Sequence, residues 1–241
     1  MNTYRISWRN CIAALSILFA MHAANAAQYA DQKNAVPPVE HATYHQLVFA
    51  DKDLAILNNL YPARSDTGFH QHSRELFYIV IEPAHAGTQK PGKPLITPPM
   101  APAGTTGYNV MTAEPFIHRV VNGDTTPYHV IGIEIRRAKP SGKWRSTRAD
   151  APQYVQIFDN PRMRAWRLIL KPSQSTLAIT TGGNGVRIVV RGGMLTTTAP
   201  HQVDQILALR RGDFAVQQSG STNALRNDGN ETIKLVEMEL K

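Results

Sequence analysis

The 241-residue chain is poor in cysteine: it has one, Cys11, and that residue lies in the first apolar segment. If that segment is removed on export, the mature protein has no disulfide, no thiolate nucleophile and no cysteine metal ligand. The sequence also lacks a G-x-S-x-G motif, a P-loop and a dinucleotide-binding glycine motif, which excludes the commonest serine-hydrolase and nucleotide sites. A content of 42% hydrophobic and 18% charged residues excludes a disordered chain and a multi-span membrane protein.

The N-terminal segment has the order of an export signal. Arg5 and Arg9 precede the apolar run Cys11–Met21, and small residues then end in Ala24-Asn25-Ala26, the pattern that signal peptidase cleaves. The run has about half of the roughly 20 apolar residues that a membrane span needs, which argues against an anchor. We therefore expect a signal peptide over residues 1–26, with cleavage near Ala26, and a periplasmic protein.

Most of the remaining chain carries strand signals. Short segments rich in valine, isoleucine, phenylalanine and tyrosine alternate with clusters of glycine and proline, and only Val203–Leu209 has the spacing of a short helix. The sequence therefore predicts an all-β protein. The clearest predicted strands are Leu76–Ile81, Tyr128–Ile135, Ala165–Leu170, Val186–Val190 and Thr232–Leu240.

Two irregular segments interrupt these strands. Pro83–Gly107 contains six prolines and four glycines, which predicts a long loop without regular pairing. Arg136–Pro152 contains six lysine or arginine residues and is either an anion-binding patch, for example for nucleic acid, or a solvated linker between domains. The predicted export favours the linker and argues against a nucleic-acid partner.

The two halves on either side of this segment resemble each other. Asn122–Ile135 aligns with Asn227–Leu240 without a gap, and each has an asparagine-led turn followed by an alternating strand. Further upstream, the segment that ends at His72 resembles the segment that ends at Thr181. Two copies of one β unit are the simplest explanation.

His70 and His72 are separated by a single residue. Because side chains alternate along a strand, both imidazoles face the same side and can reach one ion. Neutral imidazole is a common ligand of manganese, iron, cobalt, nickel, copper and zinc. The other histidines before residue 100 form no such pattern, and we expect His41 and His45 at the surface.

The segment G-F-H-Q-H-S-R-E-L-F-Y-I-V-I from Gly68, followed by His118-Arg-Val-Val-Asn122, resembles the two motifs of the cupin superfamily. The first motif is H-x-H, a short turn and a glutamate that opens an apolar strand; the second is a histidine with an asparagine four residues later. The resemblance implies a bicupin, which has two tandem double-stranded β-helix (jelly-roll) barrels. It also implies one divalent transition metal (Mn, Fe, Ni, Cu or Zn) in the N-terminal barrel. Its ligands would be His70, His72, Glu75 and His118.

Two departures from the family motifs matter. Only two residues separate His72 from Glu75, fewer than is usual in the family, so either Glu75 is the fourth ligand or three histidines hold the metal alone. In the C-terminal copy, the three histidines are replaced, so this barrel should bind no metal. The replacing residues are Ile179, Thr181 and Asn223.

The resemblance and the repeat together predict the organisation: an N-terminal barrel over residues 27–140, a linker over 141–152 and a C-terminal barrel over 153–241. We expect a metal-binding protein that acts on a small organic molecule, as an oxygenase or an isomerase. A non-catalytic module that binds a small ligand, or a protein that dimerises through its barrels, are the alternatives.

Three residues near the predicted metal are candidates for substrate contacts, and each could have a structural role instead. Tyr78 could instead pack between strands, and Asn122 could instead cap a turn. The candidates are Tyr78, Arg119 and Asn122.

Overall fold

The computed structural model describes residues 36–110, 114–140, 142 and 144–241. The predicted signal peptide, residues 1–26, lies outside these residues. Among those described, we find no helix with the length and hydrophobicity that crossing a bilayer requires. From Pro38 to Lys241 the chain forms one structural unit.

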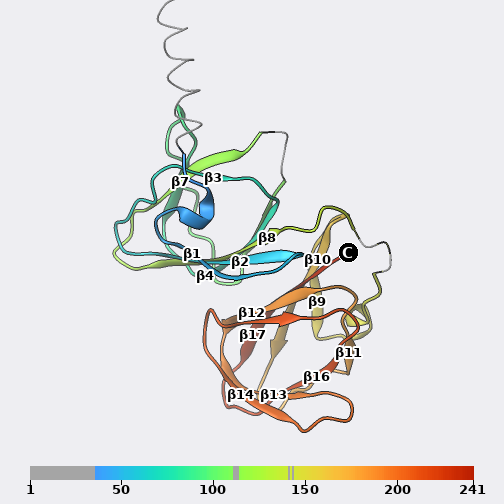
Figure 1. The fold of residues 1–241 in the computed structure, drawn as a ribbon. Helices are drawn as coiled ribbons and strands as arrows, with labels where there is room; N and C mark the ends of the chain where they lie inside the picture. The colour runs from blue at the N-terminus through green and yellow to red at the C-terminus, as the bar shows by residue number, and fades with distance from the viewer. Residues whose placement is uncertain (1–35, 111–113, 141, 143) are drawn as a thin grey trace, which may run out of the picture. The chain divides into compact units, whose positions relative to one another are not determined.

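The first eight strands form two antiparallel sheets, drawn in blue to green in Figure 1. One sheet has the order β1-β2-β8-β4-β6 and the other the order β3-β7-β5. Two sheets of this kind enclose a jelly-roll barrel, as predicted. The bounds are β1 (His45–Ala50), β2 (Leu54–Tyr61), β3 (His70–His72), β4 (Leu76–Glu82), β5 (Ala86–Gln89), β6 (Thr106–Asn109), β7 (Phe116–Asn122) and β8 (Tyr128–Ile135).

The remaining strands, yellow to red in Figure 1, form a second barrel from sheets of order β15-β12-β17-β10-β9 and β11-β16-β13-β14. One 3-10 helix precedes each barrel: η1 (Val39–His41) and η2 (Arg148–Asp150). The strand bounds are β9 (Tyr154–Asp159), β10 (Met163–Leu170), β11 (Ile179–Thr180), β12 (Gly185–Arg191), β13 (Gly193–Thr198), β14 (Gln205–Leu209), β15 (Phe214–Gln217), β16 (Thr222–Asn227) and β17 (Ile233–Leu240).

The strand registers reproduce the internal repeat. In the first barrel His70 pairs with His118, and in the second Ile179 pairs with Asn223, so the residues that the sequence alignment equated occupy the same positions. The capping asparagines also correspond. The Asn122 amide donates to the carbonyl of Thr126 (2.9 Å), and the Asn227 amide donates to the carbonyl of Glu231 (2.8 Å).

Alternation along the strands divides the apolar side chains between two cores. Every second residue of β4 and β12, including Phe77, Ile79 and Ile188, packs into a cluster that contains residues of both barrels. The intervening residues of β12 face the interior of the second barrel, where Val189 packs in a separate cluster with Trp166. Each fully buried side chain of this size contributes about 1.5–3 kcal/mol, so the shared cluster holds the two barrels in one unit.

Two expectations about local structure were wrong. Val203–Leu209 was expected to be helical, but its second part is strand β14, which pairs with β13 from Gln205 to Leu209. Pro83–Gly107 was expected to lack regular pairing, but Ala86–Gln89 pairs with β7. This stretch has no proline, so its amides are free to join an edge of the sheet.

The basic segment before the second barrel also differs from the expected solvated linker. Trp144 stacks on Trp166 with ring centroids 6.2 Å apart, and the Arg148 side chain is 1% exposed. The described residues from Trp144 onward therefore pack into the C-terminal barrel rather than only leading to it.

We predict that Asn122→Ala lowers the free energy of unfolding by about 1–3 kcal/mol, because buried backbone groups would lose their partners. Besides Thr126, the amide donates to the carbonyl of Pro62, and the side-chain oxygen accepts from the Asp124 amide. Denaturant unfolding measures the change. The exposed Asn230 is the matched control, and Asn230→Ala should change stability by less than about 0.5 kcal/mol. Equal effects from both variants would contradict this role.

Candidate metal centre

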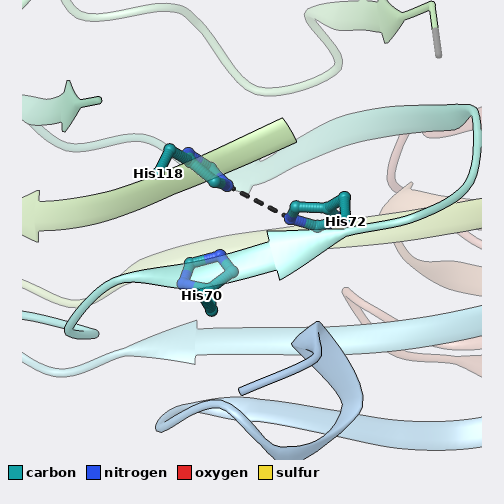
Figure 2. Close-up of side chains that lie close together, drawn as sticks. All are labelled: His70, His72 and His118. Carbon is teal, nitrogen blue, oxygen red and sulfur yellow. Dashed lines mark hydrogen bonds between the residues drawn. The ribbon is translucent and has the colours of Figure 1, made fainter. Parts of the chain in front are cut away.

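Three histidines from two paired strands meet inside the N-terminal barrel. His70 and His72 are on β3, and His118 is on β7 directly opposite His70. One nitrogen from each residue lies within 4.8 Å of the others, and all three side chains are buried. Figure 2 shows the three rings converging from the two strands. The structure therefore brings together the three histidines that the sequence motifs selected.

The nitrogens of this group fit a bound cation. His72 Nε2 and His118 Nε2 are 3.1 Å apart, which is close to the separation of two neighbouring donors on one ion with bonds of about 2.1 Å. The Nδ1 atom of His70 lies 3.2 Å from the carbonyl oxygen of Gly68 and donates to it. Its Nε2 atom is buried and has no hydrogen-bond partner among the described residues. A buried acceptor without a partner is costly, and a metal ion would satisfy it.

Burial keeps His70 and His118 neutral, which is the state that binds metals. Burial, together with the neighbouring histidines, lowers the pKa of His70 from 6.5 to about 3 and the pKa of His118 to about 2. In the absence of a metal, these two imidazoles therefore resist protonation throughout the neutral range.

His45 was expected at the surface, but it is buried beside the triad, and its ring centroid lies 4.3 Å from that of His70. Both of its nitrogens have partners: Nδ1 donates to the Thr43 carbonyl (2.9 Å) and Nε2 accepts from the Tyr61 hydroxyl (3.1 Å). This saturation makes His45 a supporting residue rather than a ligand. Its contact with Tyr61 on the neighbouring strand β2 gave no signal in the sequence.

Glu134 is a second residue that sequence reasoning missed. Its carboxylate is buried, and Oε1 lies 3.7 Å from His72 Nδ1 with no hydrogen-bond partner among the described residues. A carboxylate beyond the outer nitrogen of a ligating histidine fixes the ring and raises its basicity. The alternating strand β8 could have indicated an inward-facing glutamate, because its neighbours Ile133 and Ile135 lie on the opposite face.

The predicted fourth ligand, Glu75, lies elsewhere. Its carboxylate accepts from Arg162 Nε at 2.7 Å, outside the histidine group. The physical reason is the alternation of side chains along the strand. Glu75 is an even number of residues from Phe77 and Ile79, so it points to the same face as they do, toward the cluster shared by the two barrels. One more residue in the turn after His72 would have turned this side chain toward the interior.

The three candidate substrate residues have different positions. Arg119 pairs with Asp66 at 2.7 Å and points to the face of β7 opposite His118. Asn122 is buried and caps a turn, as described above. Tyr78 packs against the interior cluster of Tyr61, Val120 and Val130, so it shares the interior with the triad.

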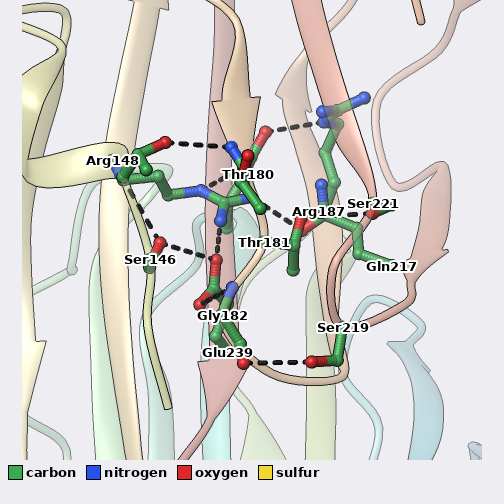
Figure 3. Close-up of polar contacts among 12 residues, drawn as sticks. Ser146, Arg148, Thr180, Thr181, Gly182, Arg187, Gln217, Ser219, Ser221 and Glu239 are labelled. Atoms are coloured by element: carbon green, nitrogen blue, oxygen red, sulfur yellow. Dashed lines mark hydrogen bonds and ion pairs between the residues drawn. The ribbon is translucent and has the colours of Figure 1, made fainter. Parts of the chain in front are cut away.

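The matching region of the C-terminal barrel contains an arginine instead of a metal-ligand group. Arg148 Nε donates to Glu237 Oε2 at 2.8 Å, and its guanidinium also pairs with Glu239. Figure 3 shows the Arg148 side chain extending between the strands toward Glu239. Burial alone would raise the pKa of Glu237, but Arg187 and Arg148 outweigh it and lower the pKa to about 2. Two guanidiniums, those of Arg148 and Arg187, therefore balance the two carboxylates of this interior.

No protein-family model and no curated protein sequence matches the chain. Among solved structures, AerE from Microcystis aeruginosa has a TM-score of 0.58 at 12% identity, covering 86% of this chain and 97% of that protein. A salicylate 1,2-dioxygenase from Pseudaminobacter salicylatoxidans has a TM-score of 0.54 at 13% identity, covering 78% and 71%. YhaK from Escherichia coli has a TM-score of 0.53 at 10% identity, covering 83% and 92%. These likenesses show the fold, and the predicted all-β fold with two jelly-roll barrels is confirmed.

We predict that metal-free protein loses stability as the pH falls below about 6.5. Histidines titrate near 6.5 in the unfolded chain, whereas burial lowers the pKa of His45 to about 4, with lower values for His70 and His118. Between these values the unfolded chain binds more protons, so acid favours unfolding. Denaturant midpoints measured from about pH 8 to about pH 4.5 should be constant above about pH 7 and then fall.

Two variants identify the contribution of the buried ring. His45→Gln can keep the bonds to Thr43 and Tyr61 without titrating, and it should flatten the pH dependence. His41→Gln, at an exposed position, should leave it unchanged. The same slope in His45→Gln and in the unsubstituted protein would contradict a neutral, buried His45.

Proposed function

We propose that this protein is a periplasmic, metal-dependent bicupin whose N-terminal barrel binds one divalent transition ion and a small organic molecule. The observation that carries the proposal is the buried group of His70, His72 and His118, whose ring nitrogens converge on one point. Each of the three rings has a buried nitrogen without a hydrogen-bond partner among the described residues. The leader pattern of residues 1–26 supports the periplasmic location.

The reaction class that we propose is oxygenase- or isomerase-type chemistry on a small organic molecule. A bound ion would supply Lewis-acid or redox chemistry at the positions that the three histidines leave open. The salicylate 1,2-dioxygenase shares the fold, which supports an oxygenase as one of the two classes. Fold alone does not fix chemistry, so the ligand group carries the argument.

The residues around the triad have separate tasks in this proposal. The Gly68 carbonyl fixes the tautomer of His70, and the Glu134 carboxylate lies 3.7 Å from the outer nitrogen of His72. Aromatic side chains form a wall beside the triad: Tyr61 stacks on Tyr128 with centroids 5.6 Å apart, and Tyr78 packs beside them. This wall would hold the organic part of a substrate.

We predict one metal ion per chain, lost on replacement of any one of the three histidines. His70→Ala, His72→Ala or His118→Ala should lower the bound metal about tenfold or more, since two imidazoles hold a divalent ion weakly. Elemental analysis of purified protein measures the content. Asn223→Ala, at the position that matches His118 in the second barrel, is the control and should retain one equivalent. Two equivalents per chain, or unchanged content in the histidine variants, would refute the site.

We predict that Glu134→Gln lowers metal affinity about 10–100-fold, because the neutral amide lacks the negative charge with which the carboxylate raises the basicity of His72. Competition with a chelator measures the affinity. The matched control is Glu75→Gln, which removes the carboxylate that the family motif selects but that pairs with Arg162 here. If Glu75→Gln weakened binding while Glu134→Gln did not, the motif assignment would be right and the proposed role of Glu134 would be wrong.

A metal content of zero in protein from carefully controlled preparations would favour the second candidate, a non-catalytic module for a small ligand. The aromatic wall around Tyr61 and Tyr78 favours this alternative, because it would hold an organic ligand without an ion.

A further inference from the structure

A cavity of about 520 Å³, within the range of small-molecule sites, is lined mainly by residues of the C-terminal barrel, together with Val48, Asn58 and Ile131 of the N-terminal barrel. It lies beside β14 and β15, which are the edge strands of the two sheets of this barrel and do not pair with each other. Leu207 of β14 and Phe214 of β15 line it, together with Val189 and Leu195 from neighbouring strands. The cavity is therefore a mostly apolar space at an unpaired seam of the barrel.

One cation, the Arg187 guanidinium, lines this cavity. Its Nε donates to Glu237 Oε1 at 2.7 Å, and its side chain is 11% exposed. Among the described residues, none forms a hydrogen bond with its two terminal nitrogens. Glu237 also pairs with Arg148, which in turn pairs with Glu239, so two carboxylates balance the two guanidiniums and the terminal nitrogens of Arg187 are left as donors. Arg187 is thus held in one orientation while its two terminal nitrogens can still donate hydrogen bonds, an arrangement suited to a planar anion.

The matching position in the N-terminal barrel holds a tyrosine, Tyr78, instead of an arginine. Tyr78 on β4 pairs with Gly107, and Arg187 on β12 pairs with Ala215. The Tyr78 ring crosses the Gly107 backbone so closely that a Cβ there would lie 2.3 Å from its hydroxyl. The tyrosine fills its barrel at this point, whereas the arginine lines an open cavity.

The charges at the cavity edge are compatible with an anion. Asp213 is the acidic residue of the lining, and its carboxylate accepts from the backbone amide of Arg210, which commits it to the turn between β14 and β15. The same turn carries Arg210 and Arg211. The cavity thus combines apolar walls, one buried guanidinium and a basic turn.

We propose that the C-terminal barrel binds a small monocarboxylate in this cavity, with the carboxylate on the terminal nitrogens of Arg187 and the apolar body against Val189, Leu195 and Leu207. This site is separate from the histidine group and needs no metal. Carboxylate and guanidinium form paired, charge-assisted hydrogen bonds, which supply the orientation, while the apolar walls supply most of the affinity.

Calorimetric titration of the full chain with hexanoate and with benzoate tests the proposal. We expect saturable binding of at least one of them with one molecule per chain, and at least about tenfold weaker binding of the uncharged amide of the same acid. Arg187→Met should weaken carboxylate binding about tenfold or more. Arg191→Met is the matched control, because Arg191 is an exposed arginine on the same strand paired with Glu231, and it should bind normally.

Two further variants keep the test decisive. Leu207→Trp fills the cavity and leaves the Arg187–Glu237 pair intact, so it should abolish binding even if Arg187→Met destabilises the barrel. His118→Ala should bind the carboxylate normally, which separates this site from the metal centre. The proposal is overturned if neither acid binds, if acid and amide bind equally, if Leu207→Trp binds normally, or if His118→Ala loses binding.

Discussion

The pairing of β3 with β7 is the constraint on which the candidate metal centre depends. It sets His70 opposite His118 and leaves His72 on the same face two residues away. Thr67 fixes this register next to the strand: its amide donates to the Val120 carbonyl (3.0 Å), and its hydroxyl accepts from the Val120 amide (2.9 Å). A slip of one residue would turn the histidines of one strand away from the interior.

The two barrels place different partners beside the buried carboxylate at the same interior position. Glu134 and Glu239 occupy matching places on the last strands, opposite Leu76 and Gly185 respectively. In the first barrel the carboxylate faces His72, a ring that can hold an external cation. In the second it faces Arg148, a cation that belongs to the chain. Removing one partner of a buried ion pair costs about 3–5 kcal/mol. The arginine is therefore a permanent part of the second barrel, whereas a metal ion in the first barrel could exchange.

Much of this arrangement could be predicted from the sequence, because strand alternation and the repeat are local properties. The spacing of His70, His72 and His118 and their counterparts in the second half followed from the alignment, and the strand registers agree with it. The position of Glu75 could not be read from its motif, because the parity of a side chain after a turn depends on the turn length.

Other parts of the site depend on contacts between residues far apart in the chain. His45 looked like a surface histidine because its partner Tyr61 comes from a neighbouring strand. Arg148 looked like one charge in a basic linker, because its partners Glu237 and Glu239 lie about ninety residues away. Sequence composition describes the segment, but burial of a charge depends on which residues the fold places beside it.

The difference between a metal barrel and a metal-free barrel involves the short 3-10 helix as well as the histidine positions. Val39 begins η1 and Arg148 begins η2, each six residues before the first strand of its barrel, and both helices close with the same backbone bonds. Both residues are 1% exposed, so each side chain is buried at the same point of its barrel. With valine there, the first interior keeps its glutamate and histidines free of an internal cation. With arginine there, Glu237 and Glu239 are already paired, and the positions that match the three histidines hold residues without an imidazole.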